Sequence, residues 1–450
     1  MGANQPVATD QDVLRLLKQA AADEGATAWI VGGYVRDKRL GRPHPDPDVV
    51  IERGSAPALA QRFARLAGAP PPVIFERFGT AQVTVPGHIV EFVSARAESY
   101  PPDSRKPVVR PASLEEDIKR RDFTINTLLM DFDGNVSDPL GRGLADLEGK
   151  VLRTPVDPAQ TFSDDPLRML RAVRFAAQLG FEPAPEIPPA MRDMKGRLAQ
   201  PVISAERIAD ELRKMLDSDR PRRAIELLDE GGLLDVVLPE VAACKGVAQG
   251  GYHTHDVYGH TLEAVQHTEA DLILRLAALF HDVGKPRTAT EEGAFTGHEE
   301  VGAAMAAAAL ERLRFPQREI EQVARLVRLH LRPVYYRSEW SDGAVRRLAR
   351  DAGDQLDRLM KLARADLGAS AYPDQEKLDE LQRRLATVLA ESPSRLMPPI
   401  DGADIMRVRN LPPGREVGRI KARLTELVMD GEIPAERDAV LEYLEGHPDL

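Results

Sequence analysis

The segment Trp29–Asp37 reads WIVGGYVRD, and the triplet Asp46-Pro47-Asp48 follows it closely. The first segment predicts a strand that ends at Val31, a Gly-Gly turn and the start of a helix. Such a turn lets backbone N–H groups approach a phosphate, and the N-terminus of the helix adds positive potential. Considered alone, the segment equally fits an ordinary tight turn, with Arg36 and Asp37 as a surface pair.

The two aspartates lie at the start of the next predicted strand, where side chains two residues apart point to the same face. Neighbouring carboxylates repel each other unless a cation lies between them. Mg²⁺ prefers oxygen ligands of this kind, and two such ions can clamp the reacting oxygens of a phosphoryl transfer. We therefore expect Asp46 and Asp48 to bind Mg²⁺, with Glu91 as a third carboxylate; a polar loop is the alternative for the aspartates alone.

The chain separates into a first third rich in short strands and a helical body. Strands are predicted at Ala28–Val31, Asp48–Glu52, Ala81–Val85 and Ile89–Ser94, and a helix at Ser55–Leu66. Further helices are predicted at Leu167–Leu179, Ser204–Leu216, Pro221–Leu228, Leu272–Phe280, Val301–Leu313 and Glu319–His330. The expected fold class is therefore α+β, an N-terminal α/β head followed by an all-helical body.

Two further segments of the N-terminal half carry charged side chains suited to a nucleotide. In Arg120–Asn126, which reads RRDFTIN, arginine, aspartate and asparagine side chains suit a triphosphate and ribose hydroxyls, although a capped helix start fits equally. In Phe162–Phe181, which reads FSDDPLRMLRAVRFAAQLGF, Asp165 and Arg168 are three residues apart and are expected on one helix face. An ion pair on a helix surface is the alternative for these two residues.

The pair of Asp165 and Arg168 suits cytosine and adenine. Both bases present an amino donor beside a ring-nitrogen acceptor, whereas guanine and uracil present the reverse order. A carboxylate accepts from the amino group and a guanidinium donates to the ring nitrogen. One such pair therefore selects C and A over G and U without a nucleic-acid template, because the wrong base leaves buried polar groups unpaired.

In this order, the motifs resemble the bacterial-type (class II) tRNA nucleotidyltransferases, a family of CCA-adding, CC-adding and A-adding enzymes and bacterial poly(A) polymerases. The resemblance runs through VGGYVRD, DPD, FERFGTAQVTV, RRDFTIN and DDPLRMLRAVRFAAQLGF, over roughly residues 28–240. It implies Mg²⁺ at Asp46 and Asp48, and tRNA, CTP and ATP as partners. It also implies nucleotide contacts from these residues: Gly32, Gly33, Arg36, Asp37, Arg121, Asp122, Asn126, Asp165, Arg168, Arg171 and Arg174.

Two departures from the family pattern remove none of the proposed ligands, and we expect the first to affect the orientation of the base-reading helix and so the balance between C and A. The segment that carries the base-selecting pair Asp165 and Arg168, called the reader segment below, begins Asp164-Asp165, where the family usually has Glu-Asp. The second departure is TLLMD after RRDFTIN, where Ala-Leu or Ala-Met is commoner in the family. A switch from C to A requires the site to reshape, and Arg96–Asp117 is the candidate flexible segment. Its prolines predict stiffness, so addition of CC alone stays open beside CCA, A addition and poly(A) synthesis.

Seven of the ten histidines lie in one predicted helical stretch: His253, His255, His260, His267, His281, His298 and His330. Imidazole and carboxylate groups suit a divalent transition metal, which activates water against a phosphate. Lys285, in HDVGKP, is placed to hold that phosphate. Individually, such histidines are also common as structural residues of a core or a surface.

The motifs HTHDVYGHT, HDVGKP, TGHEE and LHLRP resemble the HD phosphohydrolase superfamily. The resemblance implies a metal such as Mn²⁺, Ni²⁺ or Co²⁺ on His260, His281, Asp282 and Asp366, with His298 and His330 on a second metal or the phosphate. A nucleotide or cyclic-phosphate hydrolase with an RNA-binding head is the alternative function for the whole chain. The expected domains are a head at 1–155, a nucleotide-reading and RNA-binding neck at 156–245, an HD domain at 246–390 and a helical tRNA-handling tail at 391–450.

Composition fits a globular protein of several domains. The chain has 450 residues, of which 43% are hydrophobic and 29% charged. No run of apolar residues is long enough for a membrane span, no signal peptide is evident, and Cys244 is the single cysteine, so we expect a cytoplasmic protein. The net charge of −11 argues weakly against a general nucleic-acid binder, but local arginine clusters act over about 10 Å.

Overall fold

The computed structural model describes residues 9–76, 79–99, 108–199, 203–250, 255–290, 293–371, 375–391 and 398–450. The chain divides into two compact units, Met1–Val237 and Leu238–Leu450. His253 and residues 100–107 of the proline-rich segment lie outside the described residues. No helix in the described ranges is long and apolar enough to cross a membrane.

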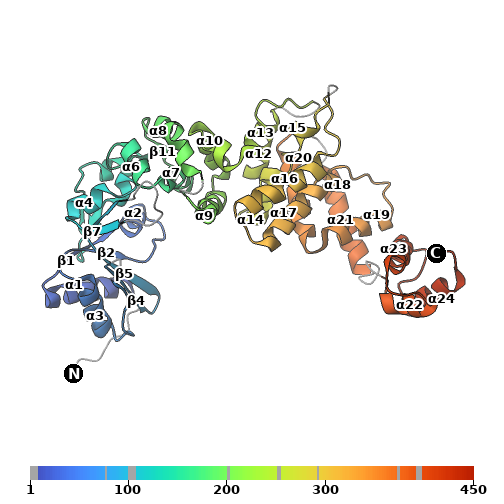
Figure 1. Cartoon of the computed structure of the whole chain (residues 1–450), viewed down its shortest axis with the longest axis horizontal. Helices are drawn as coiled ribbons and strands as arrows, with labels where there is room; N and C mark the ends of the chain where they lie inside the picture. Colours follow the sequence, from blue (N-terminus) through green and yellow to red (C-terminus); the bar gives the residue numbers. More distant parts are fainter. Residues whose placement is uncertain are drawn as a thin grey trace. The chain divides into compact units, whose positions relative to one another are not determined.

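A sheet with strand order β3-β4-β5-β2-β1-β8-β9 forms the centre of the head. Its strands are β1 Thr27–Val31, β2 Asp48–Arg53, β3 Val73–Phe75, β4 Thr80–Val85, β5 His88–Ser94, β8 Leu129–Met130 and β9 Val136–Ser137. β2 and β5 are parallel, whereas the other neighbours are antiparallel. Helix α3 (Ala56–Ala67) packs on β4 and β5 and against α1 (Asp10–Glu24) (Figure 1).

The rest of the first unit is mainly helical. Its helices are α2 Gly33–Arg39, α4 Leu114–Lys119, η2 Thr124–Asn126, α5 Gly143–Glu148, α6 Pro158–Asp164, α7 Leu167–Leu179, α8 Ile187–Met194, η3 Lys195–Leu198, α9 Ala205–Leu216, α10 Pro221–Glu230 and α11 Leu234–Val237. Two small ribbons accompany them, β6 Arg96–Ser99 with β7 Val108–Pro111 and β10 Val151–Leu152 with β11 Glu182–Pro183. Helix α7 packs against α9 and α10, which places the predicted reader segment in the centre of this part.

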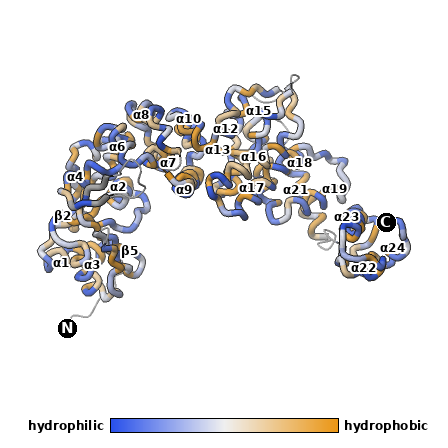
Figure 2. The backbone as a smooth tube through the Cα atoms, viewed as in Figure 1, coloured by the Kyte–Doolittle hydropathy of each residue, from blue (hydrophilic) through white to orange (hydrophobic). Residues whose placement is uncertain are grey.

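The second unit consists of helices in the described ranges. They are α12 Pro239–Ala242, α13 Val257–Gln266, α14 Leu272–Phe280, α15 Lys285–Thr288, α16 His298–Arg312, α17 Gln317–Leu329, α18 Leu331–Val334, α19 Asp342–Ala352, η4 Gly353–Gln355, α20 Leu356–Gly368, α21 Gln375–Glu391, α22 Gly402–Arg409, α23 Arg415–Asp430 and α24 Arg437–Gly446. Hydrophobic and hydrophilic stretches alternate along the helices (Figure 2). Helix α14 is buried from Ile273 onward and packs against α13, α17 and α20, which positions its C-terminal end inside the unit.

The predicted helices and strands agree closely with the structure where apolar residues recur regularly along the sequence. The helices α7 and α14 have the predicted bounds, and the four predicted strands are present with ends shifted by one residue at most. Helix α1 was not predicted, although Thr9 caps it and Gly25 ends it in a left-handed conformation. The fold is the expected α+β combination of a head with a sheet and a helical body.

Two candidate active sites

The turn between β1 and α2 brings the backbone against the predicted catalytic carboxylates. Gly32 has a φ of 80°, a conformation that favours glycine. A Cβ atom there would lie 3.6 Å from Nη1 of Arg121 and 3.7 Å from Oδ2 of Asp48. At Gly33 a Cβ atom would lie 3.1 Å from Cγ of Pro45. The glycines therefore leave room above Asp48 for a ligand that approaches the backbone.

The carboxylates of the head meet at one end of the parallel strand pair. Asp48 is opposite Glu91 in the register of β2 and β5, and the Glu91 N–H donates to the Pro47 carbonyl at 3.3 Å. Desolvation, with the charges of Glu91 and Asp46, raises the pKa of Asp48 to about 6 against the opposing effect of Arg121. Asp48 is nevertheless exposed to solvent. Asp46 is also exposed, and its Oδ1 atom lies 3.6 Å from Nδ1 of His88.

This arrangement fits a magnesium ion. Desolvation and then the neighbouring carboxylates raise the pKa of Asp48; a cation relieves the repulsion between the carboxylates, and all the donors are oxygens. Asp46, Asp48 and Glu91 are not among the described groups whose ligand atoms all lie within 4.8 Å of one another. Such sparse protein ligation is usual for Mg²⁺, which keeps water and substrate phosphate oxygens as its other ligands.

A buried network connects the start of α2 with the RRDFTIN segment. Arg36 donates to both carboxylate oxygens of Asp37, at 2.8 and 2.7 Å, and to Oδ1 of Asn126 at 2.8 Å. Asn126 donates to Asp122 at 2.9 Å, and Arg171 donates to Oδ2 of Asp122 at 3.0 Å. Arg36 and Asp37 are buried, so the surface-pair alternative is wrong. The helix-start alternative for Arg120–Asn126 is also not observed, because Thr124–Asn126 is a single 3₁₀ turn.

The charges of this network stabilise one another. Burial alone would raise the pKa of Asp122, but Arg171 and the hydrogen bond from Asn126 hold it well below the usual range. Three guanidinium groups surround the Phe175 ring, those of Arg36, Arg171 and Arg174, at 4.9, 5.3 and 4.3 Å from its centroid. Arg174 also lies 3.2 Å from a carboxylate oxygen of Glu211. Arg36 and Arg174 therefore orient this network from inside, whereas Asp122 and Arg171 line its opening.

That opening is a pocket of about 250 Å³ with a strongly charged lining. The lining residues are Arg120, Arg121, Asp122, Asp165, Leu167, Arg168, Arg171 and Arg207. The structure thus brings the predicted reader residues together with the predicted phosphate-binding residues. Arg121 faces both this pocket and Asp48, so the pocket and the carboxylates adjoin.

The conformation of the reader segment differs from the prediction. Asp165 is not on a helix face, because α6 ends at Asp164 and α7 begins at Leu167. Asp165 is extended, with φ −145° and ψ 104°, and its Oδ1 accepts from the Leu167 N–H at 3.1 Å. Pro166 interrupts the backbone hydrogen bonds that a continuous helix would need. The two reader side chains consequently come from a helix break and a helix start.

Neither reader side chain is paired with the other in the contacts described. Oδ2 of Asp165 lies 3.1 Å from Nη2 of Arg207 on α9, and Arg168 donates to the carbonyls of Thr161, at 3.3 Å, and Arg120. The surface-ion-pair alternative is therefore wrong for Asp165 and Arg168. The contact with Arg207 was not predicted, although Arg207 belongs to an arginine-dense part of the sequence.

Asp117 is a second residue that the sequence analysis missed. It is fully buried and accepts from Arg120 at 2.7 Å and from Arg121 at 3.0 Å. Burial alone would raise the pKa of Asp117, but the two arginines lower it. The i,i+3 and i,i+4 spacing of Asp117 with the two arginines was the available signal.

In the second unit, four predicted metal ligands converge from three parts of the chain. His260 is on α13, His281 and Asp282 directly follow α14, and Asp366 is on α20. Nε2 of His260 lies 2.9 Å from Oδ1 of Asp366 and 3.3 Å from Nε2 of His281, which lies 3.2 Å from Oδ2 of Asp282. These four side chains therefore form the centre of a cluster in which His260, His281 and Asp282 are buried.

The ligand atoms form two adjoining sets. His260, His281 and Asp366 form one, and Asp282, His298 and His330 form the other, each with its ligand atoms within 4.8 Å of one another. His298 begins α16, and His330 follows α17. In the described part of the chain His255 and His267 belong to neither set. Asp282, which we expected to share a metal with His260, His281 and Asp366, thus groups with His298 and His330, and the binding of a second metal or a phosphate there stays a prediction.

The orientation of the imidazoles fits a metal. In each of the four histidines of the cluster, Nδ1 faces a backbone carbonyl oxygen. The pairs are His260 with Ala369 at 3.4 Å, His281 with Ala278 at 2.8 Å, His298 with Phe295 at 2.7 Å and His330 with Val327 at 2.6 Å. Donation from Nδ1 leaves the Nε2 lone pairs directed at the cluster, as metal ligation requires. The Nε2 atoms of His298 and His330 are buried without a hydrogen-bond partner among the described residues. A divalent ion would satisfy these lone pairs.

The charges of the cluster also suit a cation. Although burial opposes it, Asp282 and Asp366 raise the pKa of His281 to about 9. Burial and the neighbouring His281 lower the pKa of His330 to about 4. Burial would raise the pKa of Asp282, but His281 and Lys285 hold it well below the usual range. The carboxylates are therefore ionised, as a transition metal requires, whereas His281 must release its extra proton when it binds the ion, because only a neutral imidazole is a ligand.

A cavity of about 660 Å³ opens on this cluster. Asp282, Lys285, His298, His330 and Asp366 line it together with apolar side chains that include those of Phe295, Val334 and Leu367. Nζ of Lys285 lies 2.6 Å from Oδ2 of Asp282 and 2.8 Å from Oε1 of Gln249. The amine therefore lies at the cavity wall beside the ligand set, as expected of a group that contacts a phosphate.

The fold and the two sites define a phosphoryl-transfer protein with a carboxylate cluster in one unit and a histidine–aspartate cluster suited to a metal in the other. Residues 28–153 match the family described as Poly A polymerase head domain, and residues 250–367 match the HD domain. Residues 180–245 match the family described as probable RNA and SrmB-binding site of polymerase A.

Known proteins are similar to this chain along nearly their whole length. The A-adding tRNA nucleotidyltransferase of Deinococcus radiodurans is 34% identical, with 92% of this chain and 94% of that protein covered. The CC-adding tRNA nucleotidyltransferase of Thermus thermophilus is 36% identical, with 92% of both covered. The crystal structure of the Bacillus stearothermophilus CCA-adding enzyme in complex with CTP, 24% identical, shares the fold with a TM-score of 0.67 over 98% of each chain. The chain belongs to the tRNA nucleotidyltransferase family.

Proposed function

We propose that this chain adds C, A or both to the 3′ end of tRNA from CTP and ATP, without a nucleic-acid template. The observation that carries the proposal is the position of Arg121. It lines the pocket that contains Asp165 and Arg168, and it also lies beside Asp48 and the Gly32 backbone. One bound nucleotide can therefore present its base to the pocket and its triphosphate to the carboxylates.

In this proposal each part of the site acts on one part of the nucleotide. Asp46 and Asp48 hold Mg²⁺, with Glu91 as the third carboxylate, and bound Mg²⁺ neutralises charge on the triphosphate. The 3′ hydroxyl of the tRNA attacks the α-phosphorus in line with the departing pyrophosphate. The backbone of Gly32 and Gly33, with Arg121, orients the phosphates.

Base selection is assigned to Asp165 and Arg168. The carboxylate accepts from the amino group of cytosine or adenine, and the guanidinium donates to the adjacent ring nitrogen. The contacts of Asp165 with Leu167 and Arg207, and of Arg168 with backbone carbonyls, fix both groups before the nucleotide binds. Asp122, Asn126 and Arg171 support the pocket and contact the ribose in this proposal.

An experiment distinguishes the possible products, because two relatives that each align with 92% of this chain are named A-adding and CC-adding. The strands β6 and β7 lie within Arg96–Asp117, the segment that we expect to influence the switch from C to A. We propose C and A as the nucleotides and treat CC, A and CCA as the products to be separated. Sequencing of 3′ ends made from tRNA that stops at the discriminator base separates them.

The second unit supports a second activity, hydrolysis of a phosphoester. Its carrying observation is the pair of buried Nε2 atoms of His298 and His330, which have no hydrogen-bond partner in the described part of the chain and face Asp282. His260, His281, Asp282 and Asp366 would hold Mn²⁺, Ni²⁺ or Co²⁺, which when bound supplies an activated water. Lys285 contacts the phosphate. Hydrolysis of bis(p-nitrophenyl) phosphate with each of these ions and with Mg²⁺ tests this activity.

A further inference from the structure

A second groove adjoins the cavity of the HD metal centre. It has a volume of about 590 Å³, within the range of pockets that bind small molecules. It shares three lining residues with the metal cavity: Glu299, Leu331 and Tyr335. Two of these, Glu299 and Leu331, directly follow the cluster residues His298 and His330 in the sequence. A ligand in the groove therefore lies next to a phosphate held at the metal centre.

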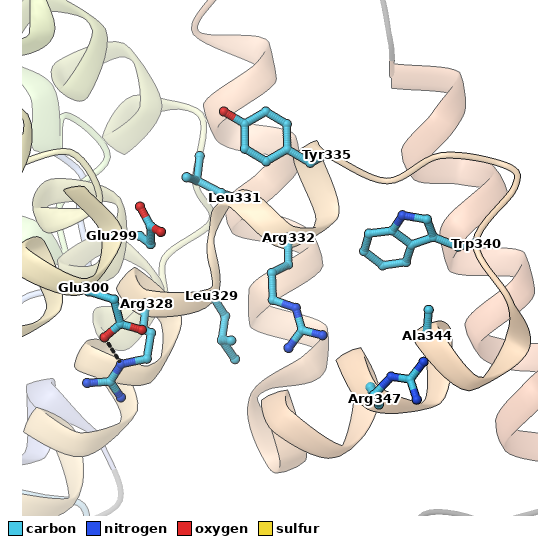
Figure 3. Close-up of a pocket in the computed structure, with 10 residues that line it drawn as sticks. All are labelled: Glu299, Glu300, Arg328, Leu329, Leu331, Arg332, Tyr335, Trp340, Ala344 and Arg347. Carbon is cyan, nitrogen blue, oxygen red and sulfur yellow. Dashed lines mark hydrogen bonds and ion pairs between the residues drawn. The ribbon is translucent and has the colours of Figure 1, made fainter. Parts of the chain in front are cut away.

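Aromatic rings and guanidinium groups line this groove. Figure 3 shows Tyr335 and Trp340 on two sides of the opening, with the Arg332 side chain beside them. Tyr335 is 64% exposed, which is unusual for so large an apolar surface. Trp340 packs edge-on against the buried Tyr336, with 5.5 Å between the ring centroids, so its ring is a fixed platform.

The arginines of the groove are held in place by acidic partners. Arg328 contacts Glu300 at 2.8 Å, and Arg332 contacts Asp351 at 2.6 Å. Arg347 contacts Glu426 and Asp430, both at 2.9 Å. A guanidinium has five N–H donors, so these contacts leave others for a ligand. Each of the three arginines is therefore already paired with a carboxylate, and the groove offers their remaining N–H donors and not an excess of positive charge.

We infer that this groove binds the nucleoside next to the phosphate that the HD centre hydrolyses. Nucleobases stack on exposed aromatic rings and arginine planes, and the arginines complement the flanking phosphates. A generic phosphoester fills only the metal cavity, whereas a nucleotide or an RNA end fills both. The inference rests on the proposed hydrolase activity and names its substrate class.

Binding can be measured separately from hydrolysis. The chain has two tryptophans, Trp29 and Trp340, so Trp29→Phe in the full chain leaves Trp340 as the only tryptophan reporter. Titration with AMP and with a short RNA bearing a 3′-phosphate should quench its fluorescence saturably, and the two arms separate a free nucleotide from an RNA end. Tyr335→Ala should weaken this binding roughly tenfold. Arg337→Ala, an exposed residue that lines neither cavity, is the matched control.

Hydrolysis then distinguishes the two proposals. Tyr335→Ala should raise the KM for the nucleotide or RNA at least several times more than the KM for a phosphoester without an aromatic ring, such as glycerol 2-phosphate. Equal effects on both substrates, or no quenching by either ligand, would overturn the nucleoside groove. Saturable, Tyr335-dependent quenching without hydrolysis of any phosphoester would support the groove and reject the hydrolase activity.

Discussion

Asp165 forms its ion pair with Arg207 of α9, at 3.1 Å, and not with Arg168. Arg168 is instead fixed by the backbone carbonyls of Thr161 and Arg120. The proposed acceptor and donor for the base are therefore held independently, from different parts of the unit. This arrangement allows each to be removed without releasing the other.

Substitution of the reader residues should change the choice of base as well as the rate. Asp165→Ala or Arg168→Ala should lower the preference for C and A over U and G by about ten- to a hundredfold, since each well-placed contact is worth roughly 1–3 kcal/mol. Arg207→Ala should have a smaller effect in the same direction, because Arg207 only orients Asp165. Competition between the four nucleotides on one tRNA measures these ratios, and unchanged ratios in both reader variants would reject the mechanism.

Asp48 should be more important for activity than for stability. Its pKa is raised from 3.8 to about 6, so the folded state binds the proton more tightly than the unfolded state. The free energy of unfolding without metal should therefore fall as the pH rises from about 4 to about 6, and Asp48→Asn should remove part of that fall. At pH 7.5 this variant should be at least as stable as the wild type in EDTA but lose nucleotide addition. Thermal unfolding with EDTA and with Mg²⁺ measures this; marked destabilisation of Asp48→Asn in EDTA would contradict it.

Asp117 should act by positioning Arg120 and Arg121. Asp117→Asn should raise the KM for CTP and ATP and lower stability by roughly 2–3 kcal/mol, less than for fully buried pairs because both arginines are partly exposed. The pKa of Asp117 is lowered in the folded protein. This stabilisation is therefore present at a pH above the pKa of Asp117 in the unfolded chain, and it is lost as the pH falls through the lower pKa of the folded state. The matched control is Glu115→Gln, an exposed residue on the same helix that contacts Lys119. Equal behaviour of the two variants would exclude the positioning role.

The two active sites should be separable by mutation. His281→Ala or Asp282→Asn should abolish hydrolysis of phosphoesters, because these residues lie at the centre of the ligand cluster, and leave nucleotide addition within about twofold. Both activities are measured on the same preparations. Absence of hydrolysis by the wild type with Mn²⁺, Ni²⁺, Co²⁺ and Mg²⁺ would mean that the histidines have a structural or regulatory role.

The sequence predicted residue types and spacings better than local geometry. Asp46 and Asp48 were identified because two carboxylates on one face of a strand repel each other unless a cation lies between them, and the parallel register of β2 and β5 places the third predicted carboxylate, Glu91, beside Asp48. Asp165 and Arg168 were placed on one helix because their i,i+3 spacing fits a helix face, whereas α6 ends at Asp164 and α7 begins only at Leu167. The contact between Asp165 and Arg207 spans 42 positions in the sequence, and no local pattern indicates it.

The most direct test of the account is the sequence of the 3′ ends that the chain produces. Purified protein is supplied with all four nucleoside triphosphates, Mg²⁺ and a tRNA that ends at the discriminator base, or at CC for A addition. The account predicts ends extended by C, A or both, no extension by G or U, and no extension by Asp48→Asn. Unextended ends on both tRNAs with the wild type, or extension with all four nucleotides alike, would contradict it.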